Sequence, residues 1–277
     1  TGERIRQRFA REARAAARLD HPSIVPVFGS GAHRGVPWYA MRRVDGQGLD
    51  QVLDDLRSGD PTLRTKALER LGAASTNTSS IASGLSNLSN RERAAVMIAH
   101  RLADALAYAH AEGVLHRDIK PGNVMIERDG STMLTDFGLC KVDGDATLTR
   151  ETDIVGTLRY MPPESFGGQT DGRGDVYGIG LLLLEILAER PAFDADDRRT
   201  LMQNILHRNP VPLSDGSLHI LEDLERVVRK AVAKLPEERY ATAADLSEDL
   251  RAVLEGQPVR ARATTSPLYL VGLFVRR

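Results

Sequence analysis

The segment of residues 114–138 constrains this chain more than any other part of its sequence. It holds a loop of charged and polar residues, and then two short apolar runs that flank a glycine turn at Gly130. Two short strands around that turn would bring Asn123, before the first run, close to Asp136, after the second. The polar residues that the segment gathers are His116, Arg117, Asp118, Lys120, Asn123 and Asp136.

These residue types suit the transfer of a phosphoryl group. Such a transfer depends on positioning and charge neutralisation more than on covalent help from the protein. We expect Asp118 to accept or orient the proton of an alcohol. Lys120, two residues later in an extended loop, can direct a positive charge to the same side. Asn123 and Asp136 offer the hard oxygen ligands that Mg²⁺ prefers.

The same residues carry a resemblance to a known family. The pattern His-Arg-Asp-x-Lys-x-x-Asn at 116–123, followed by Asp-Phe-Gly at 136–138, resembles the eukaryotic-type (Hanks-type) protein kinase family. Residues 156–164 are similar to the end of that family's activation segment, with Pro162 where alanine is usual, and residues 171–180 resemble the start of its central helix. Short sequence segments of the chain are similar to those of bacterial, planctomycete-like kinases. Lys120 favours Ser/Thr over tyrosine specificity.

The resemblance implies an α+β, protein-kinase-like fold with a mostly α-helical large lobe and an incomplete small β lobe. We expect residues 1–48 to form part of the small lobe with the hinge, residues 49–255 the large lobe, and residues 256–277 a basic tail. Hydrophobic periodicity predicts strands at 24–28 and 38–44, joined by a turn at 31–35, and helices at 3–19, 49–57, 91–113, 175–188, 199–206, 221–232 and 243–254.

Two stretches of the large lobe have a distinctive composition. Residues 58–90 are expected to be a flexible insertion with one short helix at 62–71, because residues 73–90 are too polar to offset the entropy cost of ordering them. Residues 176–187 form the longest apolar run in the body of the chain, about half of the roughly 20 residues that span a bilayer. We interpret this run as a buried core helix.

By resemblance, a further group of residues contacts the nucleotide. Met41 would be the gatekeeper beside the adenine, the Arg42 carbonyl and the Val44 amide would bond the purine, and Met125 would lie near its floor. Glu12 matches the glutamate of the family's helix C. Arg42 and Arg43 depart from the acidic or aromatic hinge that the resemblance leads us to expect, but backbone contacts would survive that change. For the apolar positions a plain packing role stays open.

The resemblance also implies two structural contacts. Asp175 would hold the backbone of the His116–Arg117 turn. Arg239 would pair with Glu164, and such a buried pair leaves a stranded charge when one partner is removed.

Regulation by phosphorylation is a further expectation. In the family, the arginine before the catalytic aspartate, here Arg117, receives an activation-loop phosphate. Thr149 and Thr152 lie in the corresponding segment, and we expect Thr149 to be the principal acceptor because it precedes Thr157 by eight residues. A phosphate there would bring about −1.5 to −2 charges to Arg117 and order the loop. The alternative is that these are solvated loop threonines.

The family's Gly-rich loop and its Val-Ala-x-Lys strand would lie before Glu12. Eleven residues precede Glu12, and none of them is lysine. We therefore expect the chain as given to be nearly inactive, with a small lobe of low stability. Two interpretations stay open: a fragment of an ordinary kinase, or a naturally shortened pseudokinase that acts as a binding or scaffolding module.

Composition and resemblance together set the expected partners. The net charge of −1 gives no global field for nucleic acid, and Cys140, the only cysteine, suits a reducing compartment. We expect ATP with Mg²⁺ or Mn²⁺ as cofactors and proteins as substrates, with dimerisation for autophosphorylation as an option. The expected location is cytoplasmic, either free or as the cytoplasmic domain of a single-pass membrane protein whose juxtamembrane stub would be residues 267–277.

Overall fold

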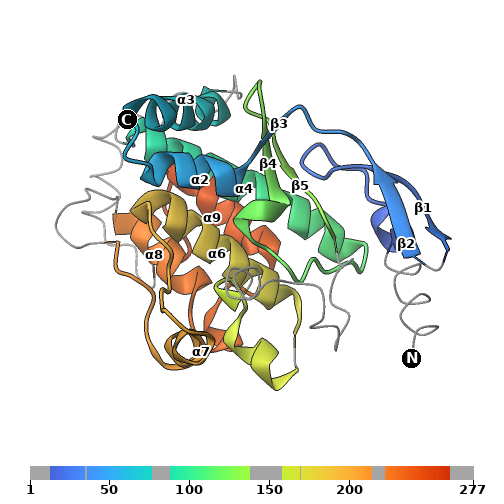
Figure 1. Cartoon of the computed structure of the whole chain (residues 1–277). Coiled ribbons are helices and arrows are strands. Elements are labelled where there is room, and N and C mark those ends of the chain that lie inside the picture. The colour runs from blue at the N-terminus through green and yellow to red at the C-terminus, as the bar shows by residue number, and fades with distance from the viewer. Residues whose placement is uncertain are drawn as a thin grey trace.

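The fold is α+β, with a mostly helical body and small antiparallel sheets at one side (Figure 1). The computed structural model describes residues 13–34, 36–76, 88–137, 158–168, 170–213 and 222–262. Residues 13–16 are helical, whereas residues 3–12 of the predicted first helix lie outside the described residues, as do residues 263–277 of the tail. The predicted architecture of the described part is confirmed.

The first sheet is a hairpin of β1 (Val27–His33) and β2 (Val36–Met41). The predicted strand boundaries are wrong, because β1 starts three residues later than expected and includes Gly31, which we had placed in the turn. Trp38 explains the shift, since a Cβ atom on Gly31 would lie 2.7 Å from the Trp38 ring. This glycine therefore permits close cross-strand packing and does not make the turn.

The second sheet contains the predicted hairpin around Gly130. Its strands are β3 (Gly46–Gly48), β4 (Val124–Glu127) and β5 (Thr132–Leu134), in that order and antiparallel. Gly130 has a φ of 83°, a conformation that favours glycine. A Cβ atom there would also lie 2.2 Å from the backbone oxygen of Ala73.

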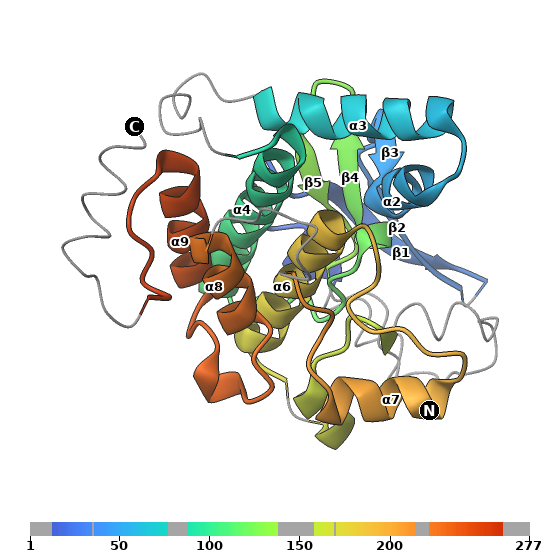
Figure 2. The same ribbon diagram turned by 90° about the vertical axis from the view of Figure 1, so that its left-hand side faces the viewer.

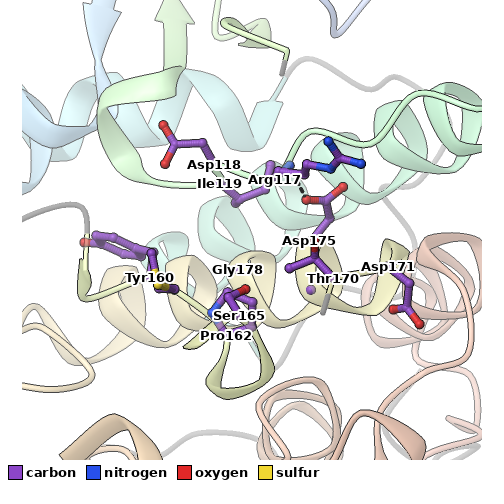
Figure 3. Close-up of a pocket in the computed structure, with 12 residues that line it drawn as sticks. Arg117, Asp118, Ile119, Tyr160, Pro162, Ser165, Thr170, Asp171, Asp175 and Gly178 are labelled. Carbon is purple, nitrogen blue, oxygen red and sulfur yellow. Dashed lines mark hydrogen bonds between the residues drawn. The ribbon is translucent and has the colours of Figure 1, made fainter. Parts of the chain in front are cut away.

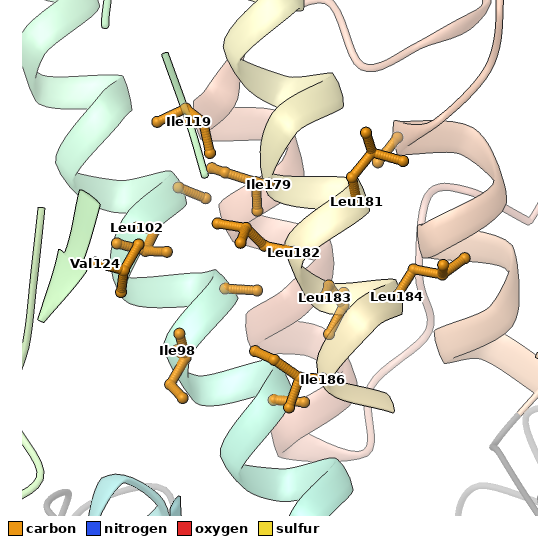
Figure 4. Close-up of a cluster of buried hydrophobic side chains, with 14 of the residues drawn as sticks. Ile98, Leu102, Ile119, Val124, Ile179, Leu181, Leu182, Leu183, Leu184 and Ile186 are labelled. Atoms are coloured by element: carbon orange, nitrogen blue, oxygen red, sulfur yellow. The ribbon is translucent and has the colours of Figure 1, made fainter. Parts of the chain in front are cut away.

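The helical body is built around α4 (Asn90–Ala111) and α6 (Gly172–Ala188). Ser89 and Glu92 form a capping box that starts α4, which explains why its boundaries match the prediction closely. Side chains of α6 pack against those of α4, with Ile98 facing Ile186 (Figure 4). Residues 176–187 of α6 are all buried, so the apolar run is a core helix as predicted. The remaining helices are α2 (Leu49–Arg57), α3 (Pro61–Thr76), α7 (Arg198–His207), α8 (Glu222–Ala231) and α9 (Ala243–Glu255), with short 3₁₀ turns at Pro121–Asn123, Pro163–Gly167 and Pro236–Glu238.

Among the described residues, no helix combines the length and the apolar character that crossing a bilayer requires. The most apolar one, α6, lies inside the helical body between α4 and α8.

The short helix expected at 62–71 is confirmed, but the flexible stretch expected from residue 73 is wrong for residues 73–76, which belong to the same helix. Residues 61–76 form the 16-residue helix α3, which lies across α4 and above the β4 strand (Figure 2). Ala67, Leu71 and Ala74 recur at helical spacing and are buried against α2 and α4. Our composition argument underestimated this segment, because a few apolar residues at helical spacing are enough to stabilise a helix that packs on the surface of α2 and α4. Residues 77–87 lie outside the described residues.

We predict that α3 contributes to the stability of the whole domain. Leu71→Ala should lower the free energy of unfolding by about 2–5 kcal/mol, because Leu71 is only 1% exposed. Leu68, on the same helix, is 42% exposed, and Leu68→Ala should change the free energy of unfolding by no more than about 0.5 kcal/mol. Urea denaturation curves for the two variants give both values. Equal effects would show that α3 does not belong to the core.

Candidate active site

The His116–Arg117 turn is held by one buried carboxylate. Asp175, in the first turn of α6, accepts hydrogen bonds from the backbone amides of His116 at 2.9 Å and Arg117 at 2.7 Å. Nε2 of His110 lies 2.8 Å from the same carboxylate. This is the contact that the resemblance implied, and it fixes the backbone directly before Asp118 (Figure 3).

The imidazole of His116 joins this turn to the end of β5. Nε2 donates to the carbonyl oxygen of Thr135 at 2.8 Å, while Nδ1 accepts from the amide of Asp118 at 3.2 Å. Full burial lowers the pKa of His116 by more than the acidic residues around it raise it, so the ring is neutral. The Phe137 ring packs edge-on against it at 4.7 Å.

Asp118, Lys120 and Asn123 come together in one loop. The Lys120 ammonium lies 2.8 Å from Oδ2 of Asp118. Nδ2 of Asn123 donates to the backbone oxygen of Asp118 at 2.7 Å and to Oδ2 at 3.1 Å. These two donors fix the carboxylate through Oδ2. No hydrogen bond from the described residues reaches its Oδ1, which leaves this oxygen open to an incoming hydroxyl group.

Asn123 and Asp136 are adjacent because β4 and β5 pair in register. The amide of Thr135 donates to the backbone oxygen of Asn123 at 2.9 Å, and Asp136 follows directly. Nδ2 of Asn123 donates its hydrogen bonds to Asp118, so Oδ1 of Asn123 is the atom left to bind a cation. Oδ2 of Asp136 is likewise not engaged by the described residues. An amide oxygen beside a carboxylate oxygen fits the hard-ligand chemistry of Mg²⁺.

The strand β2 leads into the expected adenine-binding edge. The Arg42 guanidinium lies 3.0 Å from the Glu127 carboxylate, which shows how a basic residue is accommodated there. Within the described part of the chain, the Arg42 carbonyl and the Val44 amide take part in no hydrogen bond. Met125, expected on the floor of the site, pairs with Gly48 on one side and Met133 on the other. Met41 is 43% exposed beside this edge.

The predicted pair of Glu164 and Arg239 is present, with Arg239 buried and Glu164 partly buried. The two carboxylate oxygens accept from the two terminal nitrogens of Arg239 at 2.7 Å each, in a bidentate arrangement. The Arg239 side chain is 0% exposed and also donates to the backbone oxygen of Ala233 at 2.7 Å. Its guanidinium lies 4.6 Å from the ring centre of Tyr177 on α6. The pair therefore ties the end of the activation segment to the core helix.

Several predicted residues cannot be placed. Glu12, Thr149 and Thr152 lie outside the described residues. Arg117 is described, and its exposed side chain lies beside the pocket between the catalytic loop and α6 (Figure 3). The backbone of Arg117 has a φ of 66°.

A network around Glu185 was missed in the sequence. Arg57 of α2 lies 2.5 Å from its carboxylate, and the Tyr160 hydroxyl donates to it from the activation-segment end. Burial and this carboxylate raise the pKa of Tyr160, so the hydroxyl keeps its proton. A glutamate inside the apolar run of α6 was the available signal, because a buried carboxylate needs partners.

Tyr39 was missed as well. It lies two residues before Met41 on β2, and its hydroxyl donates to Oδ1 of Asp136. Strand alternation places residues 39 and 41 on one face, and this could have identified it.

This fold and this site together define a protein kinase domain. Residues 1–250 match the family model described as "Protein kinase domain", and the chain belongs to that family.

Known proteins agree with this assignment. The chain is 34% identical, over 92% of its length, to "Probable serine/threonine-protein kinase SCO3848" of Streptomyces coelicolor, of which it covers 34%. It is also 34% identical, over 92% of its length, to "Serine/threonine-protein kinase PknB" of Mycobacterium leprae, of which it covers 37%. The crystal structure of the PknI kinase domain of M. tuberculosis matches with a TM-score of 0.63 and 28% identity, over 91% of this chain and 79% of that one. The chain thus spans about a third of the length of the curated relatives it matches.

We predict that the Glu164–Arg239 pair is needed for folding. Arg239→Ala should lower the free energy of unfolding by about 3 kcal/mol, because the Glu164 carboxylate, only 16% exposed, loses its buried partner. Arg229→Ala, in the exposed pair with Glu225, should cost about 0.5 kcal/mol or less. Chemical denaturation at neutral pH compares the two. Similar losses in both variants would contradict the structural role of the pair.

We also predict a pH dependence from His116. Its pKa in the folded protein is below the ordinary 6.5, so the unfolded chain binds a proton first as the pH falls. The contribution of His116 to stability is therefore fully present above the ordinary pKa of about 6.5. As the pH falls below that value, the free energy of unfolding should decline by up to about 1.4 kcal/mol per pH unit for one proton. Thermal or urea unfolding measured between about pH 7 and about pH 5 shows the slope. His116→Gln should have a shallower slope, whereas parallel curves would exclude His116 as its source.

Proposed function

We propose that this protein transfers the γ-phosphoryl group of ATP to serine or threonine hydroxyl groups of protein substrates. The observation that carries the proposal is the arrangement around Asp118. Its carboxylate is fixed by Lys120 and Asn123, keeps one oxygen open, and lies in a loop bonded to the strand end that bears Asp136. The bacterial Ser/Thr kinases among its relatives support this substrate class.

Each residue of the loop has a role in this proposal. The open oxygen of Asp118 would accept or orient the proton of the substrate hydroxyl. Lys120, held beside the same carboxylate, would put positive charge near the transferred phosphoryl group. Asn123 and Asp136 would hold Mg²⁺ or Mn²⁺ through their oxygens. The bound cation supplies neutralisation of the phosphate charge.

The nucleotide base would lie against the edge formed after β2. The Arg42 carbonyl and the Val44 amide, which bond to none of the described residues, offer an acceptor and a donor two residues apart, which suits a purine edge. Met41 and Met125 would contact its faces. The ion pair of Arg42 with Glu127 supports this role, because it turns the charged side chain toward β4.

We further propose that the chain of 277 residues transfers phosphate slowly by itself. Residues 1–11 contain no lysine to pair with Glu12 and to hold the α- and β-phosphates. The second candidate function is a pseudokinase that binds partners without catalysis. The presence of Asp118, Lys120, Asn123 and Asp136 favours the kinase, since a binding module does not need all of them.

Regulation would act through Arg117. A phosphate on Thr149, or on Thr152, would be attracted to this exposed guanidinium near the catalytic loop. Mass spectrometry of the active full-length protein should find phosphate on this segment, and its complete absence there would defeat the idea.

The function is tested by phosphate transfer from ATP to a generic Ser/Thr substrate, with the protein expressed from its complete gene. Asp118→Asn should lower the rate about 100-fold to 10,000-fold, because the amide cannot accept the proton. Asp54→Asn serves as the matched control, since Asp54 is 79% exposed on α2, and it should retain the full rate. Transfer that survives Asp118→Asn would remove Asp118 from the mechanism, and no transfer by any form would favour the pseudokinase.

A further inference from the structure

The Asp136 side chain is reached from the small lobe by Tyr39. This tyrosine is half-buried on β2, opposite Ser30 of β1, and its hydroxyl donates a hydrogen bond to Oδ1 of Asp136. The two residues are 97 positions apart in the chain. A carboxylate that accepts a phenol hydrogen bond forms a charge-assisted contact, which is stronger than a neutral one.

The backbone around Asp136 is fixed by other groups. His116 donates to the carbonyl of Thr135, and the amide of Thr135 donates to Asn123. Phe137 packs against the His116 ring on the other side. These contacts hold the residue in a left-handed conformation with a φ of 61°, which is uncommon for a side chain with a Cβ atom. They do not determine where its carboxylate points.

Tyr39 supplies that missing constraint. Within the part of the chain that the structure describes, its hydroxyl is the group that donates a hydrogen bond to the Asp136 carboxylate. The bond engages Oδ1 and leaves Oδ2 for a cation. Carboxylates that bind metals are themselves hydrogen-bonded as a rule, and loss of such a partner typically weakens metal binding.

We propose that Tyr39 is a positioning residue that orients the Asp136 carboxylate for the divalent cation. This inference rests on the proposed function, because it takes Asp136 to be a metal ligand. It adds that the metal site depends on β2. The same strand leads into Arg42, whose guanidinium bonds to Glu127 of β4, so β2 and the residue after it contact both β4 and Asp136, which lies two residues after β5.

The test is Mn²⁺ binding to the 277-residue chain in the presence of ADP, measured by electron paramagnetic resonance of free Mn²⁺. Tyr39→Phe removes only the hydroxyl and should weaken Mn²⁺ binding by about 10-fold or more. Tyr240→Phe is the matched control, since the Tyr240 hydroxyl also donates to an aspartate, Asp249, at 2.7 Å. This control should leave Mn²⁺ binding unchanged while it lowers the thermal midpoint.

A second readout separates positioning from a general structural role. In the protein expressed from its complete gene, Tyr39→Phe should raise the half-saturating Mg²⁺ concentration for phosphate transfer by about 10-fold. The rate at saturating Mg²⁺ should stay close to that of the wild type. A loss of rate that excess Mg²⁺ does not restore would contradict a positioning role.

Asp136→Asn distinguishes failure of the inference from failure of the proposed function. If Mn²⁺ binding is lost in Asp136→Asn but equal to the wild type, or tighter, in Tyr39→Phe, the role of Tyr39 is overturned and the metal site stands. If the wild type binds no Mn²⁺ with ADP, or binds it equally well without the Asp136 carboxylate, the metal-site proposal fails and the inference fails with it.

Discussion

The buried carboxylate of Asp175 is the contact on which the rest of the site depends. It accepts from the amides of His116 and Arg117 and contacts His110, while α6 itself is enclosed by the core. Arg117 has a φ of 66°, and such conformations cost about 1–3 kcal/mol when the residue is not glycine. Two hydrogen bonds that backbone amides donate to a charged acceptor offset a cost of that size. Apolar packing fixes α6 on all sides. The turn before Asp118 is therefore held in place through its hydrogen bonds to Asp175 of α6.

The strand end at residues 134–137 is where the two halves of the structure meet. Leu134 pairs with Val124 of β4 on one side and with Ile24, from the small-lobe segment, on the other. The amide of Val25 donates to the Leu134 oxygen at 2.9 Å, and the amide of Leu134 donates to the Ser23 oxygen at 2.9 Å. A single short strand and the residue after it therefore contact the loop of residues 116–123, the segment of residues 23–25 and strand β4. This explains how Asp136 can be adjacent to Asn123 although thirteen positions separate them in the sequence.

The sequence predicted those parts of the fold that depend on local chemistry. The apolar run of α6, the helix α4 and the loop from His116 to Asn123 all have their cause within a few residues, and each lies where we expected it. Contacts that join distant elements were predictable only where the family pattern pointed to them, as for Asp175 and for Arg239 with Glu164. The helix α3 was underestimated because its stability comes from the surface of α2 and α4 that receives Leu71. The boundaries of β1 were wrong because Trp38, on the partner strand, decides the role of Gly31.

The two parts of the candidate site differ in how firmly they are held. Asp118 and Asn123 are anchored through Asp175 and the β4–β5 register, so their positions depend on the stable core. The carboxylate of Asp136 depends on Tyr39, which belongs to a two-stranded sheet, and such sheets are marginal alone in water. Phe28 and Trp38 of that sheet are exposed, and polar contacts such as Arg42 with Glu127 help to tie it to the body. Regions with few buried apolar contacts open at low free-energy cost. Movement of β2 would therefore disturb the Asp136 carboxylate first and leave Asp118 in place, which makes the β1–β2 sheet the part of the molecule best suited to control the site.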